Sequence, residues 1–212
     1  MVLRKLMGVF MVALIIGAAS FAVAGVPDLG LSTATRAYTG TEVLSLFNLP
    51  SGGGAAFTEA NLPGGGIADA TITVTLHDGL DAPIANYPFE DITLSCDDGT
   101  HAMVPCLGGV TADGNTDALG VTQFQTPLAA GGYADANTDV LIAGAALTSG
   151  SVALRMNSAD ISADGIVNLT DVGMFSSIFY GAYDYAADFT NDGVVNLSDV
   201  GRLASGVGGS CP

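Results

Sequence analysis

The sequence predicts a mostly β protein, in which an antiparallel β-sandwich is followed by a small α-helical module. The composition favours this class, because charged residues make up only 12% of the chain and glycine occurs 29 times. Segments between residues 25 and 156 alternate polar and apolar residues, as half-buried strands do. From residue 157 onward the apolar spacing changes to three and four residues, which is typical of helices. An apolar content of 49% excludes a disordered chain.

The N-terminal 24 residues have the pattern of an export signal. Arg4 and Lys5 precede an apolar run over residues 6–19, and a small-x-small sequence follows at 22–24. We therefore expect a signal peptide at residues 1–24, with cleavage after Ala24, and an extracellular or cell-surface location. The alternative is an uncleaved membrane anchor, since the apolar run is nearly long enough to cross a bilayer.

The charge balance of the chain is strongly acidic. The formal net charge is −16, with 21 acidic residues against five basic ones. Beyond the export signal only Arg36, Arg155 and Arg202 are basic. Such a surface repels nucleic acid and anionic membranes, and it suits divalent cations. We therefore expect no nucleic-acid partner and no further membrane span after signal cleavage.

Residues 25–156, the β region, contain several strand-like segments. Residues 71–76 alternate polar and apolar side chains without a fault, which predicts a half-buried strand. Turn signals such as the Asp-Gly pair at 78–79 separate such segments. Short strands joined by turns favour an antiparallel sandwich. The other predicted strands lie at residues 42–47, 92–94, 121–126, 140–143 and 151–156.

Part of this region resembles bacterial immunoglobulin-like domains of the invasin kind. The resemblance covers residues 70–143 and includes the turn at 78–86, the segment at 117–124 and the Ala-Gly-Gly at 130–132. It implies an immunoglobulin-like β-sandwich domain at residues 25–156. The chain has no tryptophan, so the Cys-Trp-Cys core of antibody-type domains is excluded.

The chain has three cysteines, two of which bracket a short loop. In an exported protein, a disulfide between Cys96 and Cys106 is the leading prediction. Cys211 is then free, or it pairs with one of the other two. A zinc site built from both of these cysteines with His77 and His101 matches no recognised zinc spacing.

Catalytic patterns are weak in this sequence. It has only two histidines and no Gly-x-Ser-x-Gly elbow. Acidic side chains such as Glu59, Glu90, Asp91 and Asp97 could form a glycosidase pair, but solvated surface carboxylates explain them better. We therefore predict a protein that is not an enzyme. Six aromatic residues could line a sugar-binding face, although core packing is the simpler expectation: Phe47, Phe57, Tyr87, Phe89, Phe124 and Tyr133.

A twelve-residue loop occurs twice near the C-terminus, at residues 160–171 (the first loop) and 188–199 (the second loop). Oxygen-bearing side chains occupy positions 1, 3, 5, 9 and 12, and glycine occupies position 6. This is the spacing of an EF-hand-type calcium loop, in which position 7 binds through its backbone carbonyl. Ordinary Asp-Gly turns do not explain five matched positions in two copies.

The spacing therefore predicts two calcium ions as cofactors, one for each loop. Gly165 and Gly193 are expected at positive φ, where the chain must turn sharply. The predicted ligands of the first loop are Asp160, Ser162, Asp164, Ile166, Asn168 and Asp171. Those of the second loop are Asp188, Thr190, Asp192, Val194, Asn196 and Asp199.

A helix is predicted after each loop. Asn168 and Asn196 are natural N-caps, and an apolar stripe follows each of them. No helical pattern precedes the first loop, so each unit is a loop followed by a helix. The stripe residues are Leu169, Val172, Phe175, Ile178 and Phe179, then Leu197, Val200 and Leu203.

Residues 157–212, the loop–helix module, resemble the dockerin type I family in the doubled unit, the Asn at position 9 and the Asp at position 12. This resemblance implies calcium-dependent folding and docking onto a cohesin-type β-sandwich partner. Position 3 is Ser162 and Thr190, where the family usually has Asn. Position 10 is Leu169 and Leu197, where the family often has Ser, so the partner face differs.

The sequence as a whole predicts a secreted, non-catalytic protein. Its dockerin-like tail is expected to bind two calcium ions and to attach the β domain to an extracellular partner or assembly. The alternative is a carbohydrate-binding or polysaccharide-degradation component of a cellulosome-like complex, with polysaccharide as a further partner. A small glycoside hydrolase is a third hypothesis, and it requires a cleft with two carboxylates.

Overall fold

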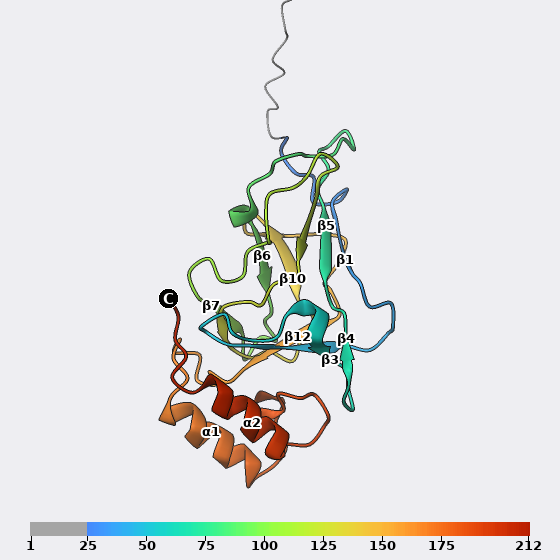
Figure 1. Ribbon diagram of the computed structural model, residues 1–212. Coiled ribbons are helices and arrows are strands. Elements are labelled where there is room, and N and C mark those ends of the chain that lie inside the picture. Colours follow the sequence, from blue (N-terminus) through green and yellow to red (C-terminus); the bar gives the residue numbers. More distant parts are fainter. Residues whose placement is uncertain (1–24) are drawn as a thin grey trace, which may run out of the picture.

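The computed structural model describes residues 25–212. The predicted signal peptide at residues 1–24 lies outside this range. Figure 1 shows a β-rich body with two helices packed side by side at the end opposite to the start of the described chain. The prediction of a mostly β protein is confirmed. No helix within residues 25–212 has the length and apolar character needed to span a membrane.

Two three-stranded antiparallel sheets form the upper part of the body. The first has the order β1 (Thr33–Arg36), β5 (Ile72–Thr75) and β8 (Val121–Phe124). The second has the order β11 (Ala145–Ala146), β10 (Asp139–Ile142) and β6 (Ile92–Ser95). Strands β5 and β6 alternate buried and half-buried residues, and their buried side chains belong to one core.

A four-stranded sheet connects the body to the helices (Figure 1). Its order is β12 (Leu154–Ser158), β2 (Leu44–Asn48), β3 (Ala60–Asn61) and β4 (Ile67–Ala68). Strand β12 pairs with β2 in parallel, whereas an all-antiparallel arrangement was expected. Every residue of β2 is buried, as is usual for a strand that is covered on both faces.

The remaining elements are short. Strands β7 (Met103–Pro105) and β9 (Ala130–Gly132) form an antiparallel pair. Three single-turn 3-10 helices occur at Phe57–Glu59 (η1), Phe89–Asp91 (η2) and Tyr185–Ala187 (η3).

Both predicted helices and both predicted N-caps are present. Helix α1 spans Leu169–Phe179 and α2 spans Leu197–Gly206. The side chains of Asn168 and Asn196 accept hydrogen bonds from backbone N–H groups in the first turn of each helix. Each N-cap N–H group in turn donates to the position-12 aspartate, which closes a capping box.

The predicted apolar stripes contain buried residues only in the later turns of the two helices. Phe175 and Leu203 are buried, as expected. Leu169 and Leu197 are instead 85% and 78% exposed. Each of them is the first residue of its helix and lies on the side that faces solvent. The buried part of each stripe therefore begins after its first residue.

The β region and the loop–helix module share one hydrophobic core. Phe189, in the second loop, is fully buried. Its ring centroid lies 5.2 Å from that of Phe47 in β2 and 5.8 Å from that of Phe175 in α1. Strand β12 continues across residue 156, where the sequence suggested a boundary, and runs into the first loop.

The disulfide joins Cys106 to Cys211, and Cys96 is a buried free thiol. The leading prediction, a bond between Cys96 and Cys106, is therefore wrong, and the alternative in which Cys211 pairs with an upstream cysteine holds. The alternation of β6 places Cys96 on the buried face beside Ile92 and Leu94. Disulfides of this kind are typical of proteins that mature in an oxidising environment.

The shared core predicts that one substitution destabilises the whole described chain. Phe189→Ala should lower the free energy of unfolding by about 3–5 kcal/mol, because it removes a ring that contacts both regions. Val194→Ala, at a 59% exposed side chain of the same loop, should cost less than about 0.5 kcal/mol. Urea unfolding followed by circular dichroism measures both. Two separate transitions, with only one shifted by Phe189→Ala, would contradict a shared core.

Candidate metal centre

The two loops begin and end with fully buried aspartates. Asp160 follows the end of β12 by two residues, and Asp188 follows η3. Asp171 and Asp199 lie in the first turns of α1 and α2. All four side chains have no exposed surface. Strand β12, η3 and the helix starts therefore place a matched pair of buried carboxylates in each loop.

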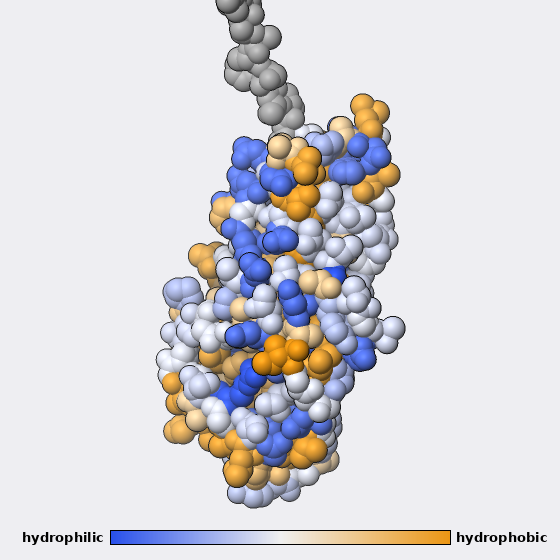
Figure 2. All heavy atoms as spheres, turned by 45° about the vertical axis from the view of Figure 1, so that its right-hand side comes forward, coloured by the Kyte–Doolittle hydropathy of each residue, from blue (hydrophilic) through white to orange (hydrophobic). Residues whose placement is uncertain are grey.

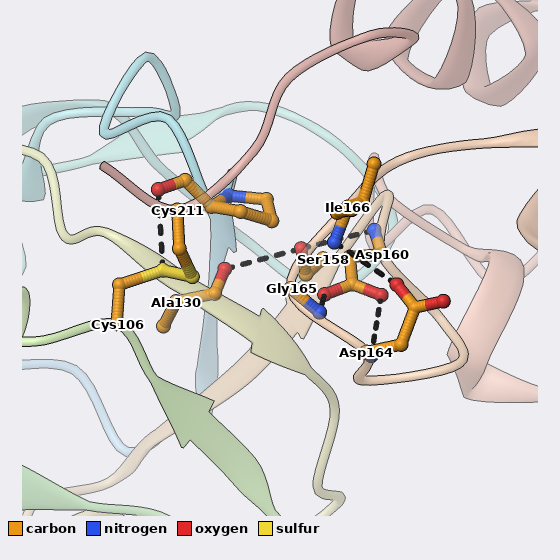
Figure 3. The surroundings of a disulfide bond; sticks show 9 residues. Cys106, Ala130, Ser158, Asp160, Asp164, Gly165, Ile166 and Cys211 are labelled. Carbon is orange, nitrogen blue, oxygen red and sulfur yellow. Dashed lines mark hydrogen bonds between the residues drawn. A yellow bond between two sulfur atoms is a disulfide. The ribbon is translucent and has the colours of Figure 1, made fainter.

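In the first loop, backbone N–H groups hold both buried carboxylates. Asp160 accepts from the N–H groups of Asp164 at 3.2 Å and Gly165 at 2.9 Å. Asp171 accepts from Ser162 at 2.9 Å and Asn168 at 2.8 Å. Figure 3 shows Asp160 turned toward Asp164 and Gly165 inside the loop. An acceptor role for all four oxygens fits ionised carboxylates.

The second loop repeats these contacts position by position. Asp188 accepts from the N–H groups of Asp192 at 3.1 Å and Gly193 at 2.9 Å. Asp199 accepts from Thr190 at 3.0 Å and Asn196 at 2.9 Å. The match between the two sequence copies is therefore also a match in the backbone N–H contacts to the four aspartates. The hydroxyl contacts differ, because Ser162 donates to Asp160 whereas Thr190 donates to Asp199.

The backbone turns in the same way in both loops. Gly165 and Gly193 have φ values of 84° and 85°, so the expectation of positive φ at position 6 is confirmed. Position 4 also has positive φ, at 60° for Ala163 and 56° for Asn191. Asn favours this conformation and Ala does not, so only the second copy carried a sequence signal for it.

Among the described residues, no basic side chain forms an ion pair with the loop carboxylates. Within residues 25–212 the ion pairs are His77–Asp81, His101–Asp98 and Arg155–Asp135. Burial raises the pKa of Asp160, and the neighbouring Asp171 and Asp164 raise it further. Burial also raises the pKa of Asp199, with a contribution from Asp188. These directions are those of buried carboxylates that form no ion pair.

In each loop the position-9 asparagine bridges two of the predicted ligand oxygens. The amide Nδ2 of Asn168 donates to Asp164 Oδ2 at 3.3 Å and to the carbonyl of Ile166 at 3.1 Å. Asn196 does the same with Asp192 and Val194, at 3.1 Å and 3.2 Å. The predicted oxygens of positions 5 and 7 therefore converge on one donor in both loops.

The donor set of each loop fits a hard cation. It consists of carboxylate, hydroxyl, amide and carbonyl oxygens, which are the ligands that Ca²⁺ prefers. Over residues 25–212, no three His, Cys, Asp or Glu side chains converge closely enough to form a metal cluster by themselves. A bound cation would have to replace the asparagine amide as the group on which the oxygens converge.

Asparagine side chains of β3 and β12 hold the backbone of the second loop. Asn61 donates to the carbonyl of Phe189 at 3.1 Å, and Asn157 donates to the carbonyl of Asp188 at 2.8 Å. Asn191 donates back to the carbonyl of Asn61 at 3.1 Å. Sequence reasoning missed these residues. All three are buried asparagines, and no pattern in the sequence marked them.

The other candidate sites have less support. Cys106 is in the disulfide, so it has no thiolate for the zinc site that was considered. Glu90 is the only carboxylate that lines a cavity of about 850 Å³ between β6, β7 and residues 107–111. Four of the six aromatics considered for a sugar-binding face are buried: Phe47, Phe57, Tyr87 and Phe124.

Comparisons with known proteins do not identify a family. No family model matches the chain, and no curated protein matches it. One solved structure with some likeness is the crystal structure of the Lin-41 filamin domain, at 11% sequence identity and a TM-score of 0.29. The match covers 61% of this chain and 95% of that one. A TM-score this low does not establish a shared fold.

The contacts of Asn61 predict that the β region stabilises the second loop. Asn61→Ala leaves the buried carbonyl of Phe189 without its donor, which should cost about 1–3 kcal/mol of stability. Hydrogen exchange should accelerate at the amides of residues 188–194 more than at those of residues 160–166. The matched control is Asn137→Ala, at an exposed asparagine with no side-chain hydrogen bond in the described structure. Equal acceleration of hydrogen exchange in both loops would contradict the role of Asn61 in stabilising the second loop.

Proposed function

We propose that this chain is a secreted, non-catalytic protein whose two loops each bind one calcium ion and whose loop–helix module attaches the β region to an extracellular partner. The observation that carries the calcium proposal is the set of four fully buried aspartates, matched in pairs and without a basic partner in the described chain. Burying an ionised carboxylate without a counter-charge is unfavourable, and a divalent cation removes that penalty.

Calcium binding would connect each loop to its helix. The position-12 carboxylates of Asp171 and Asp199 already accept the N-cap N–H groups of α1 and α2. The same carboxylates are the predicted ligands at the ends of the loops. An ion that binds the native state and not the unfolded chain adds its binding energy to folding stability. The chain's own contribution is to orient the oxygens through the backbone N–H contacts described above.

The proposed attachment surface lies on the two helices. Leu169 and Leu197 occupy the same position in the two units and are both strongly exposed. Leu197 lines a groove of about 250 Å³ between α1 and α2, together with mostly apolar side chains such as Val172 and Val200. Leu169 is exposed at the start of α1 and does not line this groove. Figure 2 shows apolar side chains gathered at the helical end of the molecule. Matched exposed leucines favour a protein partner, such as the cohesin-like β-sandwich that the dockerin resemblance implies.

Extracellular placement is part of the same proposal. The export pattern at residues 1–24 and the Cys106–Cys211 disulfide both support it. A carbohydrate-binding role remains the alternative from the sequence, and the burial of most candidate aromatics gives it little support.

Calcium should bind the full chain at two sites and stabilise it. At a free calcium concentration 100 times the dissociation constant, each site should add about 2.7 kcal/mol. The melting temperature should therefore rise by roughly 5 °C or more relative to chelator. Asp164→Asn combined with Asp192→Asn should remove most of this shift. Asp139→Asn, at an exposed aspartate outside the loops, should retain it. Identical melting of the unaltered chain in calcium and in chelator would refute the calcium sites.

The exposed leucines should be needed for attachment and not for stability. Leu169→Gln with Leu197→Gln should weaken calcium-dependent binding to immobilised cohesin-type domains by at least about tenfold. The free energy of unfolding should change by less than about 0.5 kcal/mol. Leu107→Gln, at a 98% exposed leucine of the β region, is the matched control. Surface plasmon resonance measures the binding. An equal loss of binding in the Leu107→Gln control would show that Leu169 and Leu197 do not form the specific contact with the partner.

A further inference from the structure

The C-terminal tail, residues 207–211, lies along the first loop. The N–H of Val167 donates to the carbonyl of Gly209 at 2.8 Å, and the N–H of Gly208 donates to the carbonyl of Val167 at 2.9 Å. The N–H of Cys211 donates to the carbonyl of Gly165 at 2.9 Å. Ile166 and Ser210 form an isolated antiparallel bridge. The tail therefore pairs with positions 6 to 8 of the first loop as a short extra strand.

The disulfide fixes this tail to the β region. Cys106 follows β7 directly and is 4% exposed. Its bond to Cys211 closes a separation of 105 residues. Figure 3 shows the disulfide at the left of the view, beside the first loop with Gly165 and Asp160. Opening the bond would leave the tail attached by backbone hydrogen bonds alone.

The second loop has no such support. A side chain built on Gly165 would meet the Cys211 sulfur at 3.3 Å, whereas one built on Gly193 would meet nothing within 4 Å. Within residues 25–212, no backbone group from outside the second loop forms a backbone hydrogen bond with residues 193–195. The two loops share the same internal backbone contacts and differ in what covers positions 6 to 8.

We propose that the disulfide-bound tail is a structural part of the first calcium loop, so that reduction by a thiol compound weakens calcium binding in that loop selectively. This inference rests on the proposed function of the loops. The tail forms hydrogen bonds with the carbonyl of Gly165 and with both backbone groups of Val167. These two residues flank Ile166, whose carbonyl is the predicted ligand at position 7. Without the tail, the ion itself must order the backbone of residues 165–167. This ordering costs free energy, so the calcium affinity of the first loop falls.

The redox step is an ordinary thiol–disulfide exchange. Cys211 is half-buried and Cys106 is buried, so the reductant's thiolate attacks the sulfur of Cys211 and releases Cys106 as a thiolate, which takes up a proton. A second thiol of the reductant then releases Cys211 as a thiol. Two reductant thiols are oxidised to one disulfide, and the protein disulfide is reduced to two thiols.

Two single-loop variants of the full chain test the proposal. Asp192→Ala leaves the first loop intact, and Asp164→Ala leaves the second intact. Calcium affinity is measured by isothermal titration calorimetry with and without dithiothreitol. Reduction should weaken binding about tenfold in the Asp192→Ala protein and less than about twofold in the Asp164→Ala protein. Cys106→Ser with Cys211→Ser, added to each variant, should reproduce the reduced affinity and not respond to dithiothreitol.

Hydrogen exchange in chelator provides a readout that does not depend on calcium. Reduction should accelerate exchange of the Val167 amide and leave that of Asn196, which donates within the second loop, unchanged. Equal calcium affinities of the first loop before and after reduction, or equal weakening of both loops, would overturn the proposal. An unchanged Val167 exchange rate would overturn the structural role of the tail. Absence of calcium binding in both oxidised variants would overturn the proposed function and the calcium part of this inference.

Discussion

The burial of four aspartates at the ends of two short loops is the constraint on which the loop–helix module depends. Each carboxylate is held by backbone N–H groups of its own loop, and these contacts determine how the loop turns and where its helix begins. The charge itself is not neutralised by a basic residue in the described chain. Because a buried charge without an ion-pair partner is costly, we propose that a cation completes this arrangement.

The module is not an independent attachment to the β region. Phe189 packs between β2 and α1, and the amides of Asn61 and Asn157 hold the backbone of the second loop. The disulfide-bound tail covers the first loop. Each loop is therefore supported by the β region through different contacts. An ion bound in either loop would stabilise the interface with the β region as well as the loop itself.

Local features of the structure could be predicted from the sequence, and long-range ones could not. The N-caps at Asn168 and Asn196 and the positive φ of Gly165 depend on a few neighbouring residues, so their pattern was sufficient. The pairing of Cys106 with Cys211 depends on the position of the C-terminal tail in the folded chain, because the two cysteines are 105 residues apart in the sequence. The exposure of Leu169 and the roles of Asn61 and Asn157 depend in the same way on packing between distant segments.

The central claim is that the two loops are calcium sites. Crystals of the full chain grown with calcium chloride, with diffraction recorded where calcium scatters anomalously, test this most directly. The account predicts two anomalous peaks, one inside residues 160–171 and one inside residues 188–199, each surrounded by the predicted ligand oxygens of positions 1, 3, 5, 7, 9 and 12. Loops without a peak, with the position-9 amide still bridging positions 5 and 7 in saturating calcium, would contradict it.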